Sequence, residues 1–193
     1  MRSFLAPAVA VALATACGGA AAAPTPTPIR TAPPVTRAAT PSPVCPGAPN
    51  QASTKATITL EKGGTIVIQL RPDKAPKTVS NFAFRANKGG YDGLTFHRVV
   101  AGFVVQGGDP EGTGNGGGEQ CTELSDLPFI KGAVGIARKP TPIEISNGAQ
   151  FFICIGECRN LDGGYTNFGQ VISGQDVADK VVIGDKIKTI RVE

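Results

Sequence analysis

The placement of proline divides this chain into a part that can build a folded core and a part that cannot. Between Pro24 and Pro49, nine prolines stand among Thr, Ala and Ser. Such a composition cannot bury enough apolar surface to offset its chain entropy, so it predicts an extended tether. We therefore assign a tether to residues 17–51 and one domain to residues 52–193, which is long enough for one sizeable core.

Residues 1–16 have the features of an export signal. Arg2 gives a positive start, and the apolar run from Phe4 to Ala14 is shorter than the ~20 residues that a membrane-spanning helix needs. Residues 1–16 are therefore predicted to be a signal peptide, which makes the domain extracytoplasmic.

Cys17 follows this signal directly. The segment Leu13–Gly19 resembles a bacterial lipobox, in which the cysteine is lipid-modified and becomes the first residue of the mature chain. We predict a lipid anchor at Cys17, with the tether holding the domain off the membrane. Ordinary secretion is the alternative, because Ala14–Ala16 and Ala21–Ala23 both satisfy the small-x-small rule for signal cleavage.

Charge and histidine content exclude several classes of function. The chain has 19 Lys and Arg against 15 Asp and Glu, but Arg2, Arg30 and Arg37 precede residue 52, which leaves 16 basic and 15 acidic residues in the domain. This near-neutral balance argues against a nucleic-acid-binding surface. His97 is the only histidine, which excludes zinc sites built on two or three histidines. We expect neither a metal nor another cofactor.

Four cysteines remain besides Cys17, and an exported domain meets oxidising surroundings in which disulfides form. Cys154 ends the apolar run that starts at Phe151, and a strand continuing beyond it would put Cys158 about 13 Å away, beyond bridging distance. We therefore expect Cys154 to be a buried thiol, with at most one bridge among Cys45, Cys121 and Cys158. A fully reduced set is the alternative.

Period-two patterning predicts a mainly β domain. Residues 57–61 and 65–70 alternate apolar with polar side chains around Lys62-Gly63-Gly64, which is typical of a β-hairpin. Six further runs have the composition of strands: residues 95–100, 103–106, 132–137, 151–155, 166–172 and 187–192.

Two stretches carry helix signals instead. Pro76 suits the first turn of a helix, and apolar residues at helical spacing after it predict a helix over residues 76–88. Ser173 is the expected N-cap of a second helix over residues 175–182. Eight strands with two helices favour an antiparallel barrel or sandwich with the helices at its ends.

The most informative motif is the run Phe-His-Arg-Val-Val-Ala-Gly-Phe-Val-Val-Gln-Gly-Gly-Asp at residues 96–109. On a strand of period two, Phe96 and Arg98 share one face, and Phe103 and Gln106 rejoin that face after the turn. A cation, an amide and a phenyl ring are therefore predicted to converge on one surface.

Two later motifs complete a family pattern. Gln150-Phe151-Phe152-Ile153 again sets an amide beside aromatic rings, and Leu161-Asp162-Gly163 follows. In order and spacing, the three motifs resemble those of cyclophilins, which are peptidyl-prolyl cis-trans isomerases, and the resemblance covers residues 56–192. It implies a closed eight-stranded antiparallel barrel capped by two α-helices, with the substrate groove on its outer face. We expect a monomer.

The resemblance also assigns roles to residues. Rotation about an X-Pro bond breaks amide conjugation against a barrier of ~18–20 kcal/mol. Arg98 is the implied catalytic residue, because a fixed guanidinium hydrogen-bonds the proline nitrogen in the twisted state, and Phe103 and Gln106 assist it. The positions matched to substrate binding are Val104, Ala137, Arg138, Gln150, Phe152, Leu161 and Tyr165. The backbone of Ala137 and Arg138 is expected to hold the flanking peptide.

Other residues in these motifs are expected to be structural. His97 lacks an identifiable Ser or Cys partner, so we expect a histidine whose hydrogen bonds are satisfied within the fold. Phe96, Phe151 and Phe168 are expected in the core. The stretch 112–118 contains G-x-G-x-x-G, but no strand precedes it and no apolar helix follows, so it predicts a glycine loop near the groove and not a nucleotide site.

Some positions depart from the cyclophilin pattern. Asn160 and Tyr165 stand where many eukaryotic members have Trp and His, and Arg138 replaces a common Asn. Cyclosporin, a cyclic peptide that targets the family, is therefore expected to bind weakly, because an indole donor and its contact area are missing. The segment 139–146 is lengthened, which reshapes the rim of the groove.

Together these features predict a lipid-anchored, extracytoplasmic prolyl isomerase acting on proline-containing exported polypeptides. The alternative is a non-catalytic module or holdase that binds proline-containing segments at the cell surface. The grouping of Arg98 with Phe103 and Gln106 favours catalysis, because binding alone needs no guanidinium at the amide nitrogen.

Overall fold

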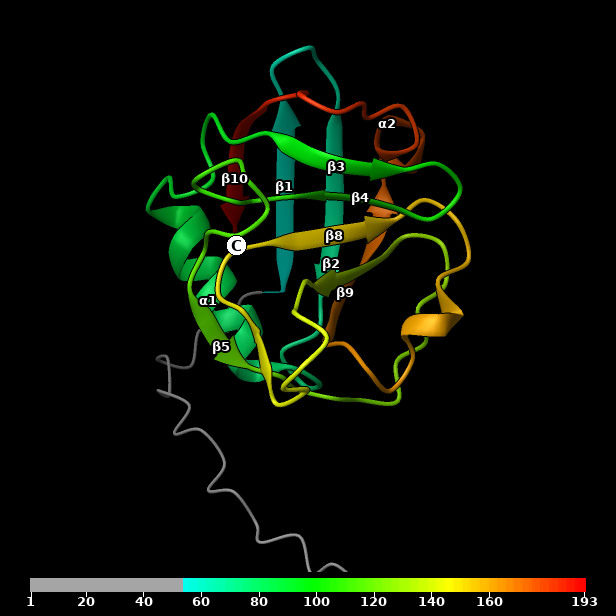
Figure 1. Ribbon diagram of the computed structural model, residues 1–193. Coiled ribbons are helices and arrows are strands. Elements are labelled where there is room, and N and C mark those ends of the chain that lie inside the picture. Colours follow the sequence, from blue (N-terminus) through cyan, green and yellow to red (C-terminus); the bar gives the residue numbers. More distant parts are fainter. Residues whose placement is uncertain (1–53) are drawn as a thin grey trace, which may run out of the picture. The chain divides into compact units, whose positions relative to one another are not determined.

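The computed structural model describes residues 54–193, whose arrangement is shown in Figure 1. The predicted signal peptide, the predicted lipidation at Cys17, the tether at residues 17–51 and Cys45 all lie outside the described residues. Within the described part, no helix has the length and apolar character needed to cross a membrane.

Eight antiparallel strands form one curled sheet, in the hydrogen-bonded order β10-β1-β2-β9-β6-β8-β4-β3. All eight correspond to strands predicted from the sequence. In Figure 1, β3, β4 and β8 run across β1 and β2, and the core lies between these two parts of the sheet. The bounds are β1 Lys55–Leu60, β2 Thr65–Leu70, β3 Phe96–Val100, β4 Val104–Gly107, β6 Ala133–Ile136, β8 Phe151–Cys154, β9 Asn167–Ser173 and β10 Ile187–Val192.

The sheet is open, which corrects the expectation of a closed barrel. β3 and β10 are its end strands, and they do not pair along their lengths. The two edges meet at one isolated bridge between Thr95 and Lys186, where the Phe96 N–H donates to the Asp185 carbonyl at 2.9 Å. Beyond this bridge, β10 pairs with β1 alone and β3 with β4 alone, so the barrel stays open.

A second sheet of two short strands was not predicted. β5 (Glu119–Cys121) pairs with β7 (Ile145–Asn147), and each strand has three residues. A period of two is not visible over such a length, so the sequence carried no signal for it.

Helix α1 (Pro76–Asn87) confirms the first predicted helix. The carboxylate of Glu123 accepts hydrogen bonds from the backbone N–H groups of Lys77 and Thr78 at 3.1 and 2.7 Å. This long-range contact supplies acceptors for the first turn, because the N-cap residue itself makes no side-chain hydrogen bond.

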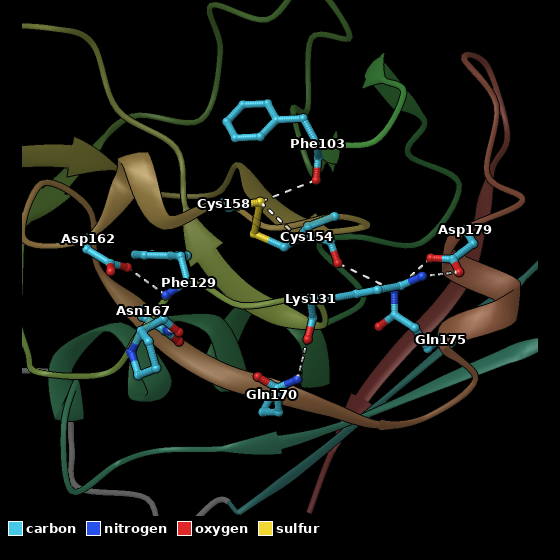
Figure 2. The surroundings of a disulfide bond; sticks show 12 residues. Phe103, Phe129, Lys131, Cys154, Cys158, Asp162, Asn167, Gln170, Gln175 and Asp179 are labelled. Atoms are coloured by element: carbon cyan, nitrogen blue, oxygen red, sulfur yellow. Dashed lines mark hydrogen bonds and ion pairs between the residues drawn. A yellow bond between two sulfur atoms is a disulfide. The ribbon is translucent and has the colours of Figure 1, made fainter.

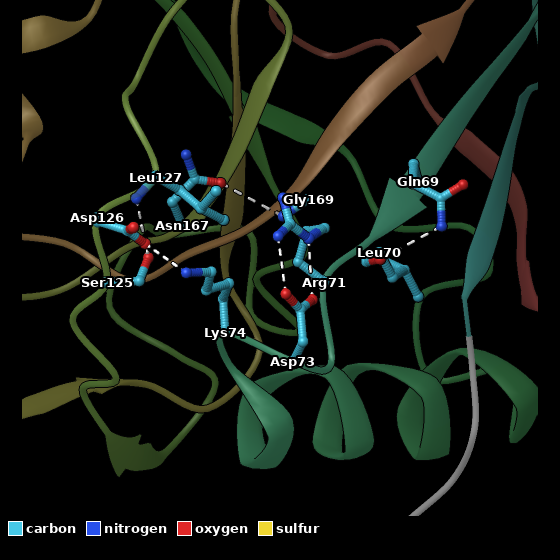
Figure 3. A network of polar contacts seen from close by, with 10 residues as sticks. All are labelled: Gln69, Leu70, Arg71, Asp73, Lys74, Ser125, Asp126, Leu127, Asn167 and Gly169. Carbon is cyan, nitrogen blue, oxygen red and sulfur yellow. Dashed lines mark hydrogen bonds and ion pairs between the residues drawn. The ribbon is translucent and has the colours of Figure 1, made fainter.

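Ion pairs mark the entry to α1, as Figure 3 shows. Arg71 Nη2 lies 2.7 Å from an Asp73 carboxylate oxygen, and Lys74 Nζ lies 2.7 Å from Asp126. The second pair links the start of the helix to the loop that carries Glu123. These side chains are partly or fully exposed, so the pairs orient the loop more than they stabilise it.

The second helix is shorter than predicted. α2 spans Gln175–Ala178, against the expected 175–182, and its N-cap is Gly174 and not Ser173. Ser173 is the last residue of β9, which continues one residue further than expected. Gly174 has a φ of 79°, so a left-handed residue makes the turn between strand and helix without a side-chain cap.

The core forms where the apolar face of α1 meets the sheet. Phe82 of α1 contacts Phe151 and Phe168, with ring centroids 5.7 and 5.1 Å apart. Phe96 also contacts Phe151, with ring centroids 6.2 Å apart. The expectation that Phe96, Phe151 and Phe168 are core residues is confirmed, because all three are fully buried.

Cys154 and Cys158 form a disulfide, which corrects the expectation of a free buried thiol at Cys154. β8 ends at Cys154 and the chain then turns, which brings the two Cα atoms to 6.3 Å, within bridging distance. Both residues are buried. Figure 2 shows the bridge close to Phe103, whose carbonyl oxygen lies 3.3 Å from Cys158 Sγ.

We predict that this bridge contributes about 2 kcal/mol to the free energy of unfolding, as expected for a loop with a sequence separation of 4. Chemical denaturation with and without reductant measures the contribution. The Cys154→Ala/Cys158→Ala double variant is the control, because it reports how reductant acts elsewhere, including at Cys121, which is also disulfide-bonded. An equal response of the two proteins to reductant would contradict the prediction.

Candidate active site

A β-bulge at His97 directs Arg98 to the outer face of the sheet. Phe96 pairs with Gly107 and Arg98 pairs with Gln106, so β3 has one residue more than β4 over this stretch. Such an extra residue offsets the alternation of side chains. Phe96 is therefore buried while Arg98 is exposed, which corrects the expectation that the two share a face.

A pocket of about 240 Å³ lies beside Arg98. Its lining comes from β3, β4 and the turn between them, from β8, from the 3₁₀ helix η1 (Arg159–Leu161) and from the loops that follow β6 and η1. Nine of the ten predicted catalytic and substrate-binding residues are brought together here: Arg98, Phe103, Val104, Gln106, Ala137, Arg138, Phe152, Leu161 and Tyr165.

The apolar side of this pocket rests on a second, smaller core. Phe152 stacks on Phe129 with ring centroids 5.7 Å apart, and it meets Tyr165 edge-on at 5.9 Å. A Cβ at Gly135 would lie 2.7 Å from Phe129 Cε1 and 2.9 Å from Phe152 Cε1, so glycine alone leaves room for both rings. The backbone of β6 thereby fixes the position of the Phe152 ring in the pocket.

A chain of amide side chains leads from Arg98 into the protein. Arg98 Nη1 donates to Gln106 Oε1 at 3.3 Å, and Gln106 Nε2 donates to Gln150 Oε1 at 2.9 Å. Gln150, the tenth predicted residue, is buried, and its Nε2 donates to the Gly116 carbonyl at 2.8 Å. Because each amide is bonded to the next, the orientation of Gln106 is fixed, and Gln106 in turn orients Arg98.

Asn147 supports this relay and was missed by the sequence reasoning. Its Oδ1 accepts the backbone N–H groups of Ala149 and Gln150, both at 2.8 Å, while its Nδ2 donates to the Gly116 carbonyl at 2.8 Å. The available signal was the Asn-Gly pair at residues 147–148, because an Asn side chain in a turn commonly bonds the backbone two residues on.

The backbone of Ala137, expected to hold the flanking peptide, is engaged inside the protein. Its N–H donates to the Gln150 carbonyl at 3.0 Å, and its carbonyl accepts the Asn147 N–H at 2.8 Å. The backbone N–H and carbonyl of Arg138 make no such bond within residues 54–193. Of the two residues, Arg138 therefore has the backbone groups that remain available.

The glycine-rich stretch 112–118 is held by a buried carboxylate and lies near the groove, as predicted. Asp109 accepts backbone N–H groups from Glu111 at 3.0 Å and from Gly114 at 2.5 Å. Burial acts to raise the pKa of Asp109, but the backbone donors, that of Gly116 included, and the nearby His97 together outweigh it and hold the pKa below its usual value. The anion is thus the state that keeps the loop in place.

His97 lies next to this loop and lines neither cavity. Within residues 54–193 neither ring nitrogen has a hydrogen-bond partner, so the expected satisfied histidine is not observed. Burial lowers the pKa of His97; the Asp109 carboxylate opposes this and the Arg98 guanidinium adds to it. Over the same residues, no three His, Cys, Asp or Glu side chains are grouped to hold a metal ion.

A second cavity of about 240 Å³ adjoins the first. Gln106, Ala137 and Arg138 line both cavities. Its other walls come from the glycine-rich stretch and Glu119, and from residues of the segment 139–146. The predicted lengthening of this segment would therefore act on the groove through the second cavity.

Arg138 forms part of the wall between the cavities. Its Cζ lies 4.6 Å from the centroid of the Tyr165 ring, which is a cation–π contact. Its Nε donates to the Gly164 carbonyl at 2.5 Å, and its Nη1 donates to the carbonyls of Lys139 and Pro140 at 2.8 and 2.9 Å. Stacking and three hydrogen bonds hold this side chain in one place.

Of the other two residues that depart from the cyclophilin pattern, one lines a cavity and the other does not. Tyr165 lines the first pocket, whereas Asn160 in η1 is exposed and lines neither cavity. Weak cyclosporin binding remains a prediction that depends on these two positions.

Comparison with known proteins decides the family. The model of the family "Cyclophilin type peptidyl-prolyl cis-trans isomerase/CLD" matches residues 55–192, nearly all of the described part. The chain belongs to the cyclophilins. It is a peptidyl-prolyl cis-trans isomerase, as the motifs predicted.

Bacterial relatives agree with this assignment over most of their length. The chain is 45% identical over 138 residues to peptidyl-prolyl cis-trans isomerase B of Bacillus subtilis (strain 168), covering 69% of this chain and 94% of that protein. A peptidyl-prolyl cis-trans isomerase of Helicobacter pylori (strain J99) is 42% identical over 142 residues, covering 70% and 85%.

A solved structure confirms the cyclophilin-like fold. The cyclophilin type peptidyl-prolyl cis-trans isomerase of Cryptosporidium parvum matches with a TM-score of 0.67 at 28% identity. The match covers 73% of this chain and 98% of that one.

We predict that Asp109 contributes acid sensitivity to this cyclophilin. Its folded-state pKa lies below the unfolded value of about 3.9, so its stabilising effect is present above about pH 4 and is lost as the pH falls through the folded-state pKa. Between about pH 6 and about pH 2, the free energy of unfolding should therefore fall further in the native protein than in Asp109→Asn. Equal falls, measured by urea denaturation, would argue against this role, because the other carboxylates are common to both proteins.

Proposed function

We propose that this cyclophilin rotates X-Pro bonds without a covalent intermediate, with Arg98 as the catalytic residue. The observation that carries the proposal is an exposed guanidinium at the edge of a pocket with an apolar side. As the X-Pro bond twists, the proline nitrogen loses conjugation and its lone pair becomes an acceptor. Arg98 uses one N–H on Gln106, and its other donors, which have no partner within residues 54–193, can hydrogen-bond the twisted amide more strongly than the planar one.

The apolar side of the pocket gives the proline ring its place. Phe103, Phe152 and Leu161 line it, and burial of ring carbons against them contributes a few kcal/mol of binding. The flanking chain is proposed to pair with the available backbone groups of Arg138. In support, the structure of the Cryptosporidium parvum relative was determined in the presence of the dipeptide Ala-Pro; it matches with a TM-score of 0.66 at 28% identity.

The enzyme is further proposed to act outside the cytoplasm on proline-containing exported polypeptides, from a lipid anchor at Cys17. The export signal at residues 1–16 and the proline-rich tether at residues 17–51 support this site of action. The Cys154–Cys158 disulfide supports it independently, because such bonds persist in oxidising compartments.

Arg98→Ala should lower kcat/KM for a short X-Pro peptide by about 100-fold or more, because it removes the donor to the twisted amide. Thermal unfolding should be unchanged, because the Arg98 side chain is exposed. Lys188→Ala is the control, since it removes an exposed cation of β10 that lines neither cavity. A loss within about twofold would exclude Arg98 as the electrostatic element. Peptide binding by the native protein without acceleration would favour the holdase alternative.

Cys17→Ala should move the protein from the membrane fraction to the soluble extracytoplasmic fraction, because the change removes the sulfur that accepts the lipid. Cys45→Ala is the matched control and should stay with the membrane. Mass spectrometry of the mature native protein checks the modification directly. An unmodified amino terminus at Cys17 or Pro24 would show ordinary secretion instead.

A further inference from the structure

We propose that Arg138 selects substrates that carry an acidic side chain within two residues of the proline, by pairing its guanidinium with their carboxylate. This inference rests on the proposed function, because it assigns a substrate class to the same groove. Three observations support it: the charge of the groove, the fixed position of Arg138 and the donors that this side chain has left.

The groove carries positive charge without matching negative charge. Arg98 and Arg138 line the first pocket, and Arg138 and Lys139 line the second cavity, whereas Glu119 is the acidic residue in these linings. None of the three cations forms an ion pair within residues 54–193, although eight other Lys and Arg side chains of that part do. The domain as a whole is close to neutral, so the positive charge is a local property of the groove.

Arg138 is already held in place before any ligand binds. Its ring contact with Tyr165 and its bonds to the carbonyls of Gly164, Lys139 and Pro140 restrict the side chain. A ligand therefore pays little of the entropy that usually opposes a contact to a long, mobile side chain. An exposed surface cation, in contrast, would lose more conformational entropy when a ligand binds.

The same bonds leave one end of the guanidinium available. Of its five N–H donors, three serve the carbonyls, which leaves those on Nη2 without a partner in residues 54–193. A carboxylate is the acceptor that matches such a group best in charge and geometry. Because Arg138 lines the proline pocket itself, and an extended chain rises about 3.3 Å per residue, that carboxylate belongs to a residue next to the proline or one further on.

Peptide charge tests the inference on the native protein. Two series of peptides with blocked termini, X-Ala-Pro-Gly and Gly-Ala-Pro-X, carry Glu, Gln or Lys at X. In at least one series, kcat/KM should be about threefold or more higher for Glu than for Gln, and lower for Lys than for Gln. In about 1 M NaCl the differences should largely disappear, because the Debye length falls to about 3 Å.

Variants assign the preference to Arg138. Arg138→Gln should bring the Glu-to-Gln ratio of kcat/KM close to one, and Arg138→Lys should keep part of the preference through its charge. Lys188→Gln, which removes an exposed cation outside both cavities, should keep the native ratio. The effect should be on KM, because the carboxylate pairs equally with Arg138 in the planar and twisted states.

The outcomes separate this inference from the function on which it rests. Equal kcat/KM for the Glu, Gln and Lys peptides, or a native ratio retained in Arg138→Gln, would overturn the role of Arg138 and leave the isomerase function intact. No acceleration of any peptide would overturn the function itself. If Arg138→Gln does not fold, the response of the native protein to peptide charge and salt decides the matter.

Discussion

The extra residue at His97 places the Arg98 side chain on the outer face of the sheet, away from the core. The groove depends on that placement. With the bulge, Phe96 packs against Phe151 inside the sheet while Arg98 lies outside it. Without the bulge, the two side chains would share a face, which would either bury a guanidinium or expose a phenyl ring. Burying an unpaired charge costs several kcal/mol, so the bulge reconciles a stable core with a cation at the groove.

The buried amide of Gln150 links that cation to the rest of the fold. It bonds Gln106 on one side and the Gly116 carbonyl on the other, so the glycine-rich loop and the Arg98 side chain depend on one residue. Removing either partner would leave a buried amide group unsatisfied, at a cost of about 1–3 kcal/mol. Asp109 also holds this loop, by accepting backbone N–H groups. The loop is thus part of the support of the groove.

The strands of four or more residues could be predicted because their apolar runs are long enough to show a period, and α1 because its apolar residues recur at helical spacing after Pro76. The three-residue strands β5 and β7 had no such signal. Closure of the barrel depends on how β10 and β3 are placed relative to each other. The alternation of apolar and polar residues along a strand does not predict that placement.

The grouping of the pocket residues could be predicted from the motifs, and the structure brings nine of the ten together. The bulge at His97 could not be predicted, because the run Phe96-His97-Arg98 fits a regular strand of period two equally well. The Cys154–Cys158 bond was missed for a related reason: nothing in the apolar run shows that the chain turns directly after it. In both cases, the backbone conformation of a short segment decides which side chains meet.

The wall that the two cavities share has a consequence for ligand design. Gln106, Ala137 and Arg138 line both, so a molecule that fills one cavity ends where the other begins. Each cavity, at about 240 Å³, is small for a tightly binding compound. Two weak fragments joined across this wall convert the second binding event into an intramolecular one, with an effective concentration of about millimolar for a short linker. Joining two fragments can therefore raise the affinity for this groove without enlarging the contact area in either cavity.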